Sequence, residues 1–150
     1  ETIESQIDNE ITLSEARKSE MAVLFIDVDD FKHYNDQYSH ATGDQVLKFV
    51  ARTIKGTVNE FGFAGRYGGD EFIACIRNAE INDPTRAAQD IISKLEEGFE
   101  CDGVHLTVSV SIGISMIKDD YNTRVEYIIG KADDAMYSVK KNGKSNYAFI

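Results

Sequence analysis

Two pairs of acidic residues follow apolar segments, and carboxylates in such an arrangement can be ligands for divalent metal ions. The segment AVLFIDVD contains Asp27 and Asp29, and the segment RYGGDEF contains Asp70 and Glu71. In a strand, Asp27 and Asp29 lie on the same side, and Val28 points the other way. Mg²⁺ prefers oxygen ligands, commonly one or two carboxylates together with substrate phosphates. If the two segments are neighbouring strands, the acids could hold metal ions for in-line displacement at phosphorus.

The segment RYGGDEF also has a purely structural interpretation. Gly68 and Gly69 lie between two strand-like segments, FGFAGRY and DEFIACI. Paired glycines at such a place predict a hairpin turn, because tight turns need a positive φ. The two acids beside the turn would then simply be solvated. This segment alone does not decide between the two interpretations, and the second acidic pair favours chemistry.

Basic residues near the end of the sequence could contact phosphate groups. Lys140 and Lys144 are four residues apart in KKNGKS, so a continuing helix would put both on one face. A basic helix end that complements the helix dipole also explains them, and the spacing alone favours that explanation. Lys32 in DDFKHYND is a similar case. NGKS is not a phosphate-binding P-loop, because position 138 is Ser and the motif ends a helix.

Asn35 and Asp44 are polar residues that follow the first apolar segment, and two roles are open for them. Asp44 could cap a helix that begins at Gln45. Alternatively, the two residues could form a base pocket, since an aspartate accepts hydrogen bonds from N1–H and the exocyclic amine of guanine, which adenine cannot supply. The spacing does not decide between these roles.

The remaining reactive residues support no other chemistry. Cys75 lies in an apolar, strand-like segment and Cys101 in a polar loop, without a CxxC pair or a nearby histidine. A zinc site or redox motif is therefore not expected, and both thiols are expected to be free in a reducing cytoplasm. His33, His40 and His105 form no HExxH motif, and no GxSxG segment is present for a hydrolytic serine.

Composition limits the class of protein and its partners. The 150 residues are 42% hydrophobic and 28% charged, which suits a single globular domain over residues 1–150. The net charge of −10 argues against nucleic acid or an anionic membrane as the main partner. A phosphorylated ligand remains compatible if divalent cations stand between the charges. Because the first residue is not Met, we expect a piece of a longer protein, which could carry a membrane anchor elsewhere.

Hydrophobic periodicity predicts how these residues are positioned. We expect a surface helix within residues 1–20, strands over 22–28, 61–67, 70–76, 103–115 and 146–150, and helices over 45–58, 85–98 and 124–143, with a helical turn and loop over 31–44. This order predicts an α+β fold with a βαββαβ core of the ferredoxin-like kind. Its central sheet is mainly antiparallel and flanked by helices.

Five ordered segments resemble the GGDEF family of bacterial diguanylate cyclases. Between Val23 and Ser145 they are FIDVDDFKHYND, YSHATGD, RYGGDEF, VSVSIGIS and KADDAMYSVKKNGKS. The resemblance implies a fold like the palm of nucleotidyl cyclases. It also implies that two GTP molecules are condensed into cyclic di-GMP, with release of two pyrophosphates, by a homodimer whose upstream sensor or regulatory domain drives dimerisation. The domain would work in the cytoplasm.

The same resemblance implies roles for individual residues. The metal ligands would be Asp27, the carbonyl of Val28 and Asp70, with Glu71 as the additional acid, for two Mg²⁺ or Mn²⁺ ions per active site. Asn35 and Asp44 match the guanine-binding pair. The phosphate contacts would come from the backbone at Asp30 and Phe31 and from Lys32, Lys140 and Lys144. Gly68 and Gly69 would let the hairpin tip approach the nucleotide.

Three departures from the family pattern affect these expectations. Asn59 and Gly62 stand where many members have an RxxD product-inhibition site, so we expect no feedback inhibition through that site. Ser39 replaces a glycine in YSH, and the DxLTGLxNR segment is absent. A catalytically weak GTP-binding regulatory module is the alternative function, although such members typically lose the signature acids. A purely structural dimerisation domain is a third hypothesis.

Overall fold

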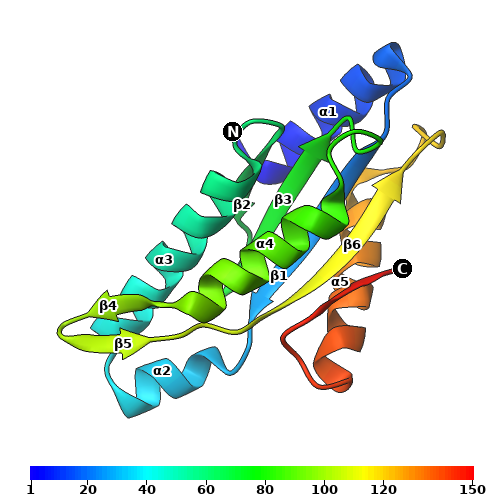
Figure 1. Cartoon of the computed structure of the whole chain (residues 1–150). Helices are drawn as coiled ribbons and strands as arrows, with labels where there is room; N and C mark the ends of the chain where they lie inside the picture. The colour runs from blue at the N-terminus through cyan, green and yellow to red at the C-terminus, as the bar shows by residue number, and fades with distance from the viewer.

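The computed structural model describes residues 1–150 as a central sheet between two layers of helices (Figure 1). The helices are α1 (Ile3–Arg17), α2 (Phe31–Gln37), α3 (His40–Val58), α4 (Pro84–Glu97) and α5 (Val125–Lys141). The strands are β1 (Met21–Val28), β2 (Gly62–Arg66), β3 (Glu71–Arg77), β4 (Phe99–Cys101), β5 (Val104–Leu106), β6 (Val110–Ile117) and β7 (Tyr147–Phe149). None of the helices combines the length and the apolar character needed to cross a membrane.

The five-stranded sheet has the order β2-β3-β1-β6-β7, so β1 lies at its centre. β1 pairs antiparallel with both β3 and β6, β2 pairs antiparallel with β3, and only β7 runs parallel to its neighbour β6. The predicted α+β fold, with a mainly antiparallel sheet flanked by helices, is confirmed. The end of β1 is thereby surrounded by both of its neighbouring strands.

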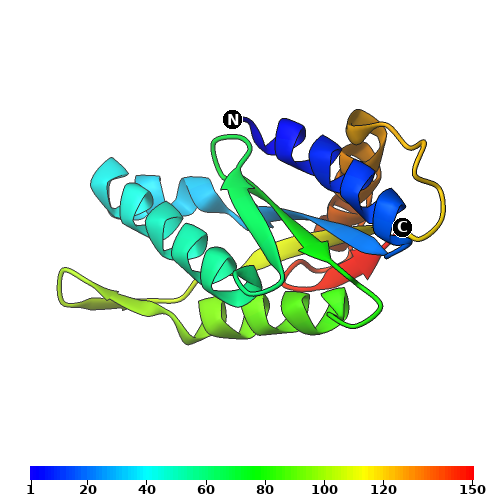
Figure 2. The same cartoon turned by 90° about the horizontal axis from the view of Figure 1, so that it is seen from above.

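Side chains of β1 alternate between two hydrophobic clusters. Leu24, Ile26 and Val28 belong to the cluster beneath α3 and α4, whereas Val23 and Phe25 belong to the cluster beneath α1 and α5. Figure 2 shows these helix pairs on opposite sides of the sheet. Because side chains alternate along a strand, Asp27 continues the face that α5 covers.

The segment predicted as one strand over 103–115 is in fact two strands. β5 folds back on β4 to form a separate two-stranded hairpin, and β6 joins the main sheet. Phe99 of β4 stacks on Phe49 of α3 with ring centroids 4.5 Å apart, which anchors the hairpin. Val104 is exposed, so the apolar alternation does not mark one continuous buried face. Cys101, predicted in a loop, ends β4 and is buried.

Helix α3 begins five residues before the predicted start at Gln45, with His40 as its first residue. The side chain of Ser39 accepts a hydrogen bond from the Thr42 backbone N–H at 3.1 Å and caps the helix. Of the two roles left open for Asp44, the capping role is therefore excluded, because Ser39 provides the cap. Asp44 lies inside the first turns of α3 and its carboxylate is exposed.

The last helix and β6 approach each other closely at Gly113. A Cβ atom at Gly113 would overlap the Ala132 carbonyl oxygen and the Met136 backbone nitrogen of α5. In contrast, a Cβ atom at Gly130, on α5 itself, would meet nothing within 4 Å. The missing side chain of Gly113 therefore sets how near α5 lies to the sheet.

We expect Gly113→Ala to lower the free energy of unfolding by about 1–3 kcal/mol, because the added methyl group overlaps the α5 backbone. As the matched control, Gly130→Ala should leave it unchanged or raise it by up to about 1 kcal/mol, because alanine favours a helix interior. Urea unfolding followed by circular dichroism measures both. Equal effects of the two substitutions would contradict the close packing of α5 on β6.

Candidate active site

Strand pairing brings the two acidic segments together. In the β1–β3 register Asp27 lies opposite Glu71, and the Val28 N–H donates to the Asp70 carbonyl at 3.2 Å. The condition under which the acids could meet, that the first strand lies beside the hairpin, is thus fulfilled. Asp70 is half-buried and not at an exposed tip, because the turn folds against the end of β1.

The turn between β2 and β3 is held by backbone bonds and by one arginine. The N–H groups of Tyr67 and Gly68 both donate to the Glu71 carbonyl, at 2.8 and 3.2 Å. The Arg66 Nε donates to the Gly68 and Gly69 carbonyls, each at 3.1 Å. The sequence analysis gave Arg66 no role. In the structure, its side chain holds the turn in place.

The two glycines of the turn are explained by space and not by a positive φ. Neither Gly68 nor Gly69 adopts a positive φ, so that part of the prediction is wrong. A Cβ atom at Gly68 would overlap the Glu71 carboxylate, whereas one at Gly69 would meet no protein atom within 4 Å. Gly68 therefore makes room for the acid, and Gly69 leaves the outer side of the turn open.

Asp27 has an unsatisfied oxygen, which fits a metal ligand. Its side chain is 16% exposed, and its Oδ1 is buried without any hydrogen-bond partner. Burial, together with the nearby Asp70 and Glu71, raises the pKa of Asp27 to about 7 against the opposing effect of Lys140. A cation is the natural partner for such an atom, because unpaired buried carboxylates are unfavourable.

The protein donors can supply only some of the ligands of a magnesium-type site. No three Asp, Glu, His or Cys side chains converge closely enough to enclose a metal by themselves. Mg²⁺ and Mn²⁺ take oxygen ligands, and Mg²⁺ commonly keeps only one or two carboxylates beside substrate phosphates. Asp27 and the Val28 carbonyl at the end of β1, and Asp70 just before β3, supply oxygens of this kind. The residues present therefore fit an open site that a phosphate ligand completes.

Glu71 has a further acidic neighbour that the sequence analysis missed. Burial raises the pKa of Glu71, and Asp133 of α5 and Asp70 raise it further. Burial and the neighbouring Asp134 also raise the pKa of Asp133. Glu71 and Asp133 both lie in segments that resemble the GGDEF family. Only the packing of α5 on the sheet shows that the two acids are neighbours.

The two C-terminal lysines reach the end of β1 by different routes. Lys140, in the last turn of α5, lies with its Nζ 3.3 Å from the Val28 carbonyl oxygen and 3.6 Å from Asp27 Oδ2. Helix α5 ends at Lys141, so the predicted helical continuation is wrong, and Lys144 has a positive φ of 63°. Its Nζ lies 2.9 Å from Asp30 Oδ1, and this hydrogen bond raises the pKa of Lys144.

Asp29 connects several segments around the end of β1 by hydrogen bonds, a role that the sequence analysis did not predict. It accepts hydrogen bonds from Ser109 Oγ, Ser111 Oγ and the Ser145 N–H, at 2.5, 2.7 and 3.1 Å, and from Lys140. Burial alone would raise the pKa of Asp29, but these hydrogen bonds outweigh it and lower the pKa. Asp29 therefore ties the end of β1 to β6 and to the segment that leads into β7.

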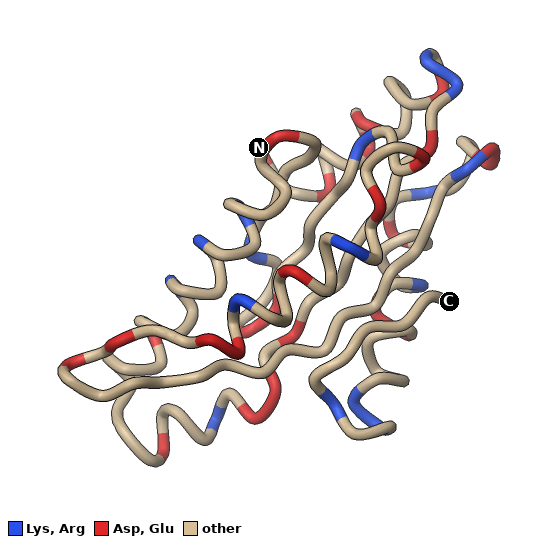
Figure 3. The backbone as a smooth tube through the Cα atoms, viewed as in Figure 1, with Lys and Arg blue, Asp and Glu red and all other residues tan.

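The predicted base-binding residues share a pocket with the hairpin tip. A pocket of about 360 Å³ is lined by residues that include Phe31, Lys32, Asn35, Asp44, Gly69 and Asp70. Asn35 lies against Gly43, where a Cβ atom would overlap the Asn35 Oδ1. Figure 3 shows acidic positions where β1 leads into α2 and basic positions where α5 ends. The pocket thus extends from Asn35 and Asp44 to Asp70 at the hairpin.

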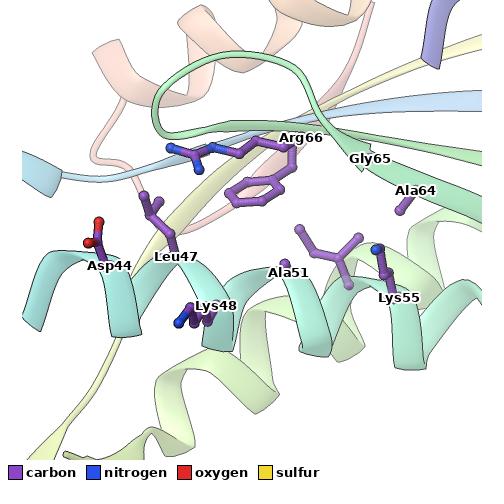
Figure 4. A pocket seen from close by; sticks show the side chains of 10 residues that line it. Asp44, Leu47, Lys48, Ala51, Lys55, Ala64, Gly65 and Arg66 are labelled. Atoms are coloured by element: carbon purple, nitrogen blue, oxygen red, sulfur yellow. The ribbon is translucent and has the colours of Figure 1, made fainter. Parts of the chain in front are cut away.

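A second hollow adjoins this pocket between α3 and β2 (Figure 4). It has a volume of about 260 Å³ and shares Asp44, Leu47 and Arg66 with the pocket lined by Asn35. In Figure 4, Arg66 extends from the end of β2 over the helix, and Leu47 points toward the hairpin loop. The shared residues form the wall between the two hollows.

The positions of the missing inhibitory motif are structural. Asn59 is the exposed C-terminal cap of α3, and Gly62 is the first residue of β2. A Cβ atom at Gly62 would overlap the Cys75 carbonyl oxygen. The backbone at this position therefore leaves no room for an aspartate side chain.

Asp30, whose backbone is predicted to face phosphate, has a positive φ of 53°.

We expect Asp27 to make the metal-free chain less stable as pH rises. Its folded-state pKa of about 7 exceeds the ordinary 3.8, so between these values the folded chain holds a proton that the unfolded chain has lost. The free energy of unfolding should therefore fall as pH rises from about 4 to about 7. Urea midpoints with chelator at about pH 5 and about pH 8 measure this, with Asp27→Asn as control. Parallel pH dependences of the two proteins would contradict it.

Known proteins are similar in sequence to this chain over most of its length. The family model for "Diguanylate cyclase, GGDEF domain" matches residues 1–146. Diguanylate cyclase A of Treponema denticola is 38% identical over 136 residues, which cover 90% of this chain and 36% of that protein. Diguanylate cyclase DosC of Escherichia coli is 37% identical over 129 residues, covering 83% and 27% respectively. The chain thus spans between about a quarter and about a third of these relatives.

Solved structures share the fold. The GGDEF domain of PA1120 (YfiN or TpbB) from Pseudomonas aeruginosa superposes with a TM-score of 0.90 at 32% identity, covering 98% of this chain and 92% of that one. The active GGEEF domain of a diguanylate cyclase from Vibrio cholerae superposes with a TM-score of 0.87 at 26% identity, covering 98% and 93%. The topology around the acids is therefore one that solved proteins also adopt.

Proposed function

The chain belongs to the GGDEF family of diguanylate cyclase domains, and from this membership we propose that it condenses two GTP molecules into cyclic di-GMP. The observation that carries the proposal is the buried, unpartnered Oδ1 of Asp27 beside Asp70 and Glu71. A pocket lined by Asn35 and Asp44 also reaches Asp70 of this group. A nucleotide bound there would extend from a base-binding end to an acidic end.

The base-binding end would select guanine. Asp44, whose carboxylate is exposed on α3, can accept hydrogen bonds from both N1–H and the exocyclic amine of guanine. Asn35 from α2 lies across the same pocket and can pair with the remaining edge of the base. Phe31 and Leu47 provide apolar contacts for the ring in this pocket.

The triphosphate would lie between the lysines and the start of α2. Lys32 lines the base pocket, and Lys140 and Lys144 lie at the end of β1 beside Asp27 and Asp30. Three ammonium groups balance much of the charge of a triphosphate. The backbone at Asp30 and Phe31 turns from β1 into α2 at this point and could donate N–H groups to the phosphates.

The reaction forms one new bond for each bond that it breaks. The 3′-oxygen of each GTP bonds to the α-phosphorus of the other, the bond to the bridging oxygen breaks, and pyrophosphate leaves. Glu71, with its raised pKa, would accept the 3′-hydroxyl proton or support a second metal. Asp27, the Val28 carbonyl and Asp70 would hold two Mg²⁺ or Mn²⁺ ions, whose charge activates the hydroxyl and stabilises the leaving group.

Catalysis would need two copies of the domain. One copy has a single base pocket of this composition, so two copies must face each other for two GTP molecules to react. We therefore propose a homodimer that an upstream sensor or regulatory domain brings together. The net charge of −10 argues against contact of this domain with nucleic acid or an anionic membrane.

Feedback inhibition through the RxxD site should be absent. Asn59 cannot form the two-point contact of an arginine guanidinium, and the crowding at Gly62 leaves no room for the aspartate. Restoring the motif by substitution would therefore also have to move the start of β2 away from Cys75.

We expect Asp70→Asn to lower the rate of cyclic di-GMP formation about 100-fold or more, because a metal ligand and its charge are lost. The assay incubates concentrated protein with GTP and Mg²⁺ and detects the product by mass spectrometry. An unaltered circular dichroism spectrum would show that the variant is folded. A wild-type rate in the variant would overturn the role of the acids, and tight GTP binding without product in the wild type would favour the regulatory module.

We expect Asp44→Ala to reduce the preference for GTP over ATP about tenfold or more, because a charge-assisted hydrogen-bond acceptor for guanine is lost. Competition binding of the two nucleotides measures the preference. Asp36→Ala, which removes an exposed acid of α2 outside the base pocket, is the control and should leave it unchanged. Undiminished selectivity in Asp44→Ala would mean that the base binds elsewhere.

A further inference from the structure

We propose that the Lys140 ammonium is the resident counter-cation of the acidic site, and that a metal ion must displace it from the Val28 carbonyl and the Asp27 carboxylate. The inference deepens the proposed function and rests on it, because it concerns the same acids. It gives Lys140 a role before substrate arrives, in addition to a contact with phosphate.

The contacts of Lys140 overlap with the proposed metal ligands. Its Nζ lies 3.3 Å from the Val28 carbonyl oxygen, 3.6 Å from Asp27 Oδ2 and 3.1 Å from Asp29 Oδ1. Two of these three oxygens belong to residues that would hold metal. An ammonium and a divalent cation cannot bind the same oxygens at once, because like charges at such distances repel strongly. Lys140 and the metal therefore compete for one place.

Partial burial makes this contact more than a screened surface ion pair. The side chain of Lys140 is 24% exposed, that of Asp27 is 16% exposed and that of Asp29 only 3%. No other lysine or arginine forms an ion pair with Asp27 or Asp29, since Lys144 pairs with the exposed Asp30. The neutralising charge at this place thus comes from one side chain.

One lysine satisfies the site incompletely. An ammonium has three N–H donors, and that of Lys140 donates to the Val28 carbonyl and to Asp29 Oδ1 and forms an ion pair with Asp27 Oδ2. The Oδ1 of Asp27 nevertheless stays without a partner. A divalent cation carries twice the charge and can bind several oxygens at once. Displacement of Lys140 therefore becomes favourable when a metal arrives together with phosphates that give the lysine a new anionic partner.

This competition couples the binding of metal and nucleotide. Metal alone must break the Lys140 contacts without any compensation for the freed ammonium. In the presence of a triphosphate, the freed Lys140 binds phosphate instead. Metal should therefore tighten nucleotide binding, and nucleotide should tighten metal binding by the same factor.

We expect Lys140→Met to bind Mn²⁺ at least about fivefold more tightly than the wild type when no nucleotide is present. The experiment titrates Mn²⁺ into each protein and measures free Mn²⁺ by its electron paramagnetic resonance signal. Lys141→Met is the matched control, since Lys141 is exposed on the same helical turn and packs over the Tyr137 ring, 4.8 Å from its centroid. That variant should stay within about twofold of the wild type.

Lys140→Gln is a second variant that keeps a neutral hydrogen-bond donor, and it should shift Mn²⁺ affinity in the same direction. The inference is overturned if neither Lys140 variant binds Mn²⁺ more tightly, or if Lys141→Met tightens binding equally. Turnover of GTP by the wild type is measured in parallel. Tightened Mn²⁺ binding without product would refute only the proposed function, whereas product with unchanged Mn²⁺ affinities would refute only this inference.

Discussion

Burial of negative charge at the end of β1 is the constraint on which the rest of the site depends. Asp27 near the end of the central strand is partly buried and Asp29 just beyond it is buried, and Asp70 and Glu71 approach from the start of the neighbouring strand β3. A buried carboxylate is unfavourable unless it is paired or hydrogen-bonded. The chain satisfies Asp29 with its own hydroxyl, amide and ammonium groups, but it leaves one oxygen of Asp27 without a partner. The structure itself thus satisfies Asp29, whereas Asp27 keeps one oxygen that a ligand could bind.

The groups that balance this charge come from the far end of the sequence. Gly113 lets α5 lie directly against β6, and the last turn of α5 then brings Lys140 to the acids. Beyond α5, a short turn with left-handed backbone carries the Ser145 N–H to Asp29 and leads into β7. The parallel strand at the sheet edge thus completes the site as well as the sheet. A loss of packing at Gly113 would therefore reach the acids through Lys140.

Local patterns predicted the elements well, because each is encoded by neighbouring residues. The apolar segments and the hairpin follow from period and turn residues. The meeting of Asp27 with Glu71 depends on the pairing of β1 with β3, which the sequence analysis could state only as a condition. The start of α3 did not, since Ser39 and Asp44 are both good caps and only packing selects between them. The role of Asp29 was also out of reach. Its partners Ser109, Ser111 and Ser145 are 80, 82 and 116 residues away, and no spacing rule connects them.

The register that places Asp27 opposite Glu71 depends on the packing of a hydrophobic residue two positions earlier on β1. A slip of one residue between strands would move every side chain to the other face and separate Asp27 from Glu71. Burial on both faces of β1 does not by itself prevent such a slip, because apolar residues would still meet apolar residues. The size of the side chains prevents the slip. The large Phe25 pairs with Gly113 on β6 and contacts the ring of Tyr67 in the turn, with ring centroids 5.7 Å apart. No neighbouring position of β1 offers a ring to Tyr67, so this contact between β1 and the turn helps to set the register of the acids.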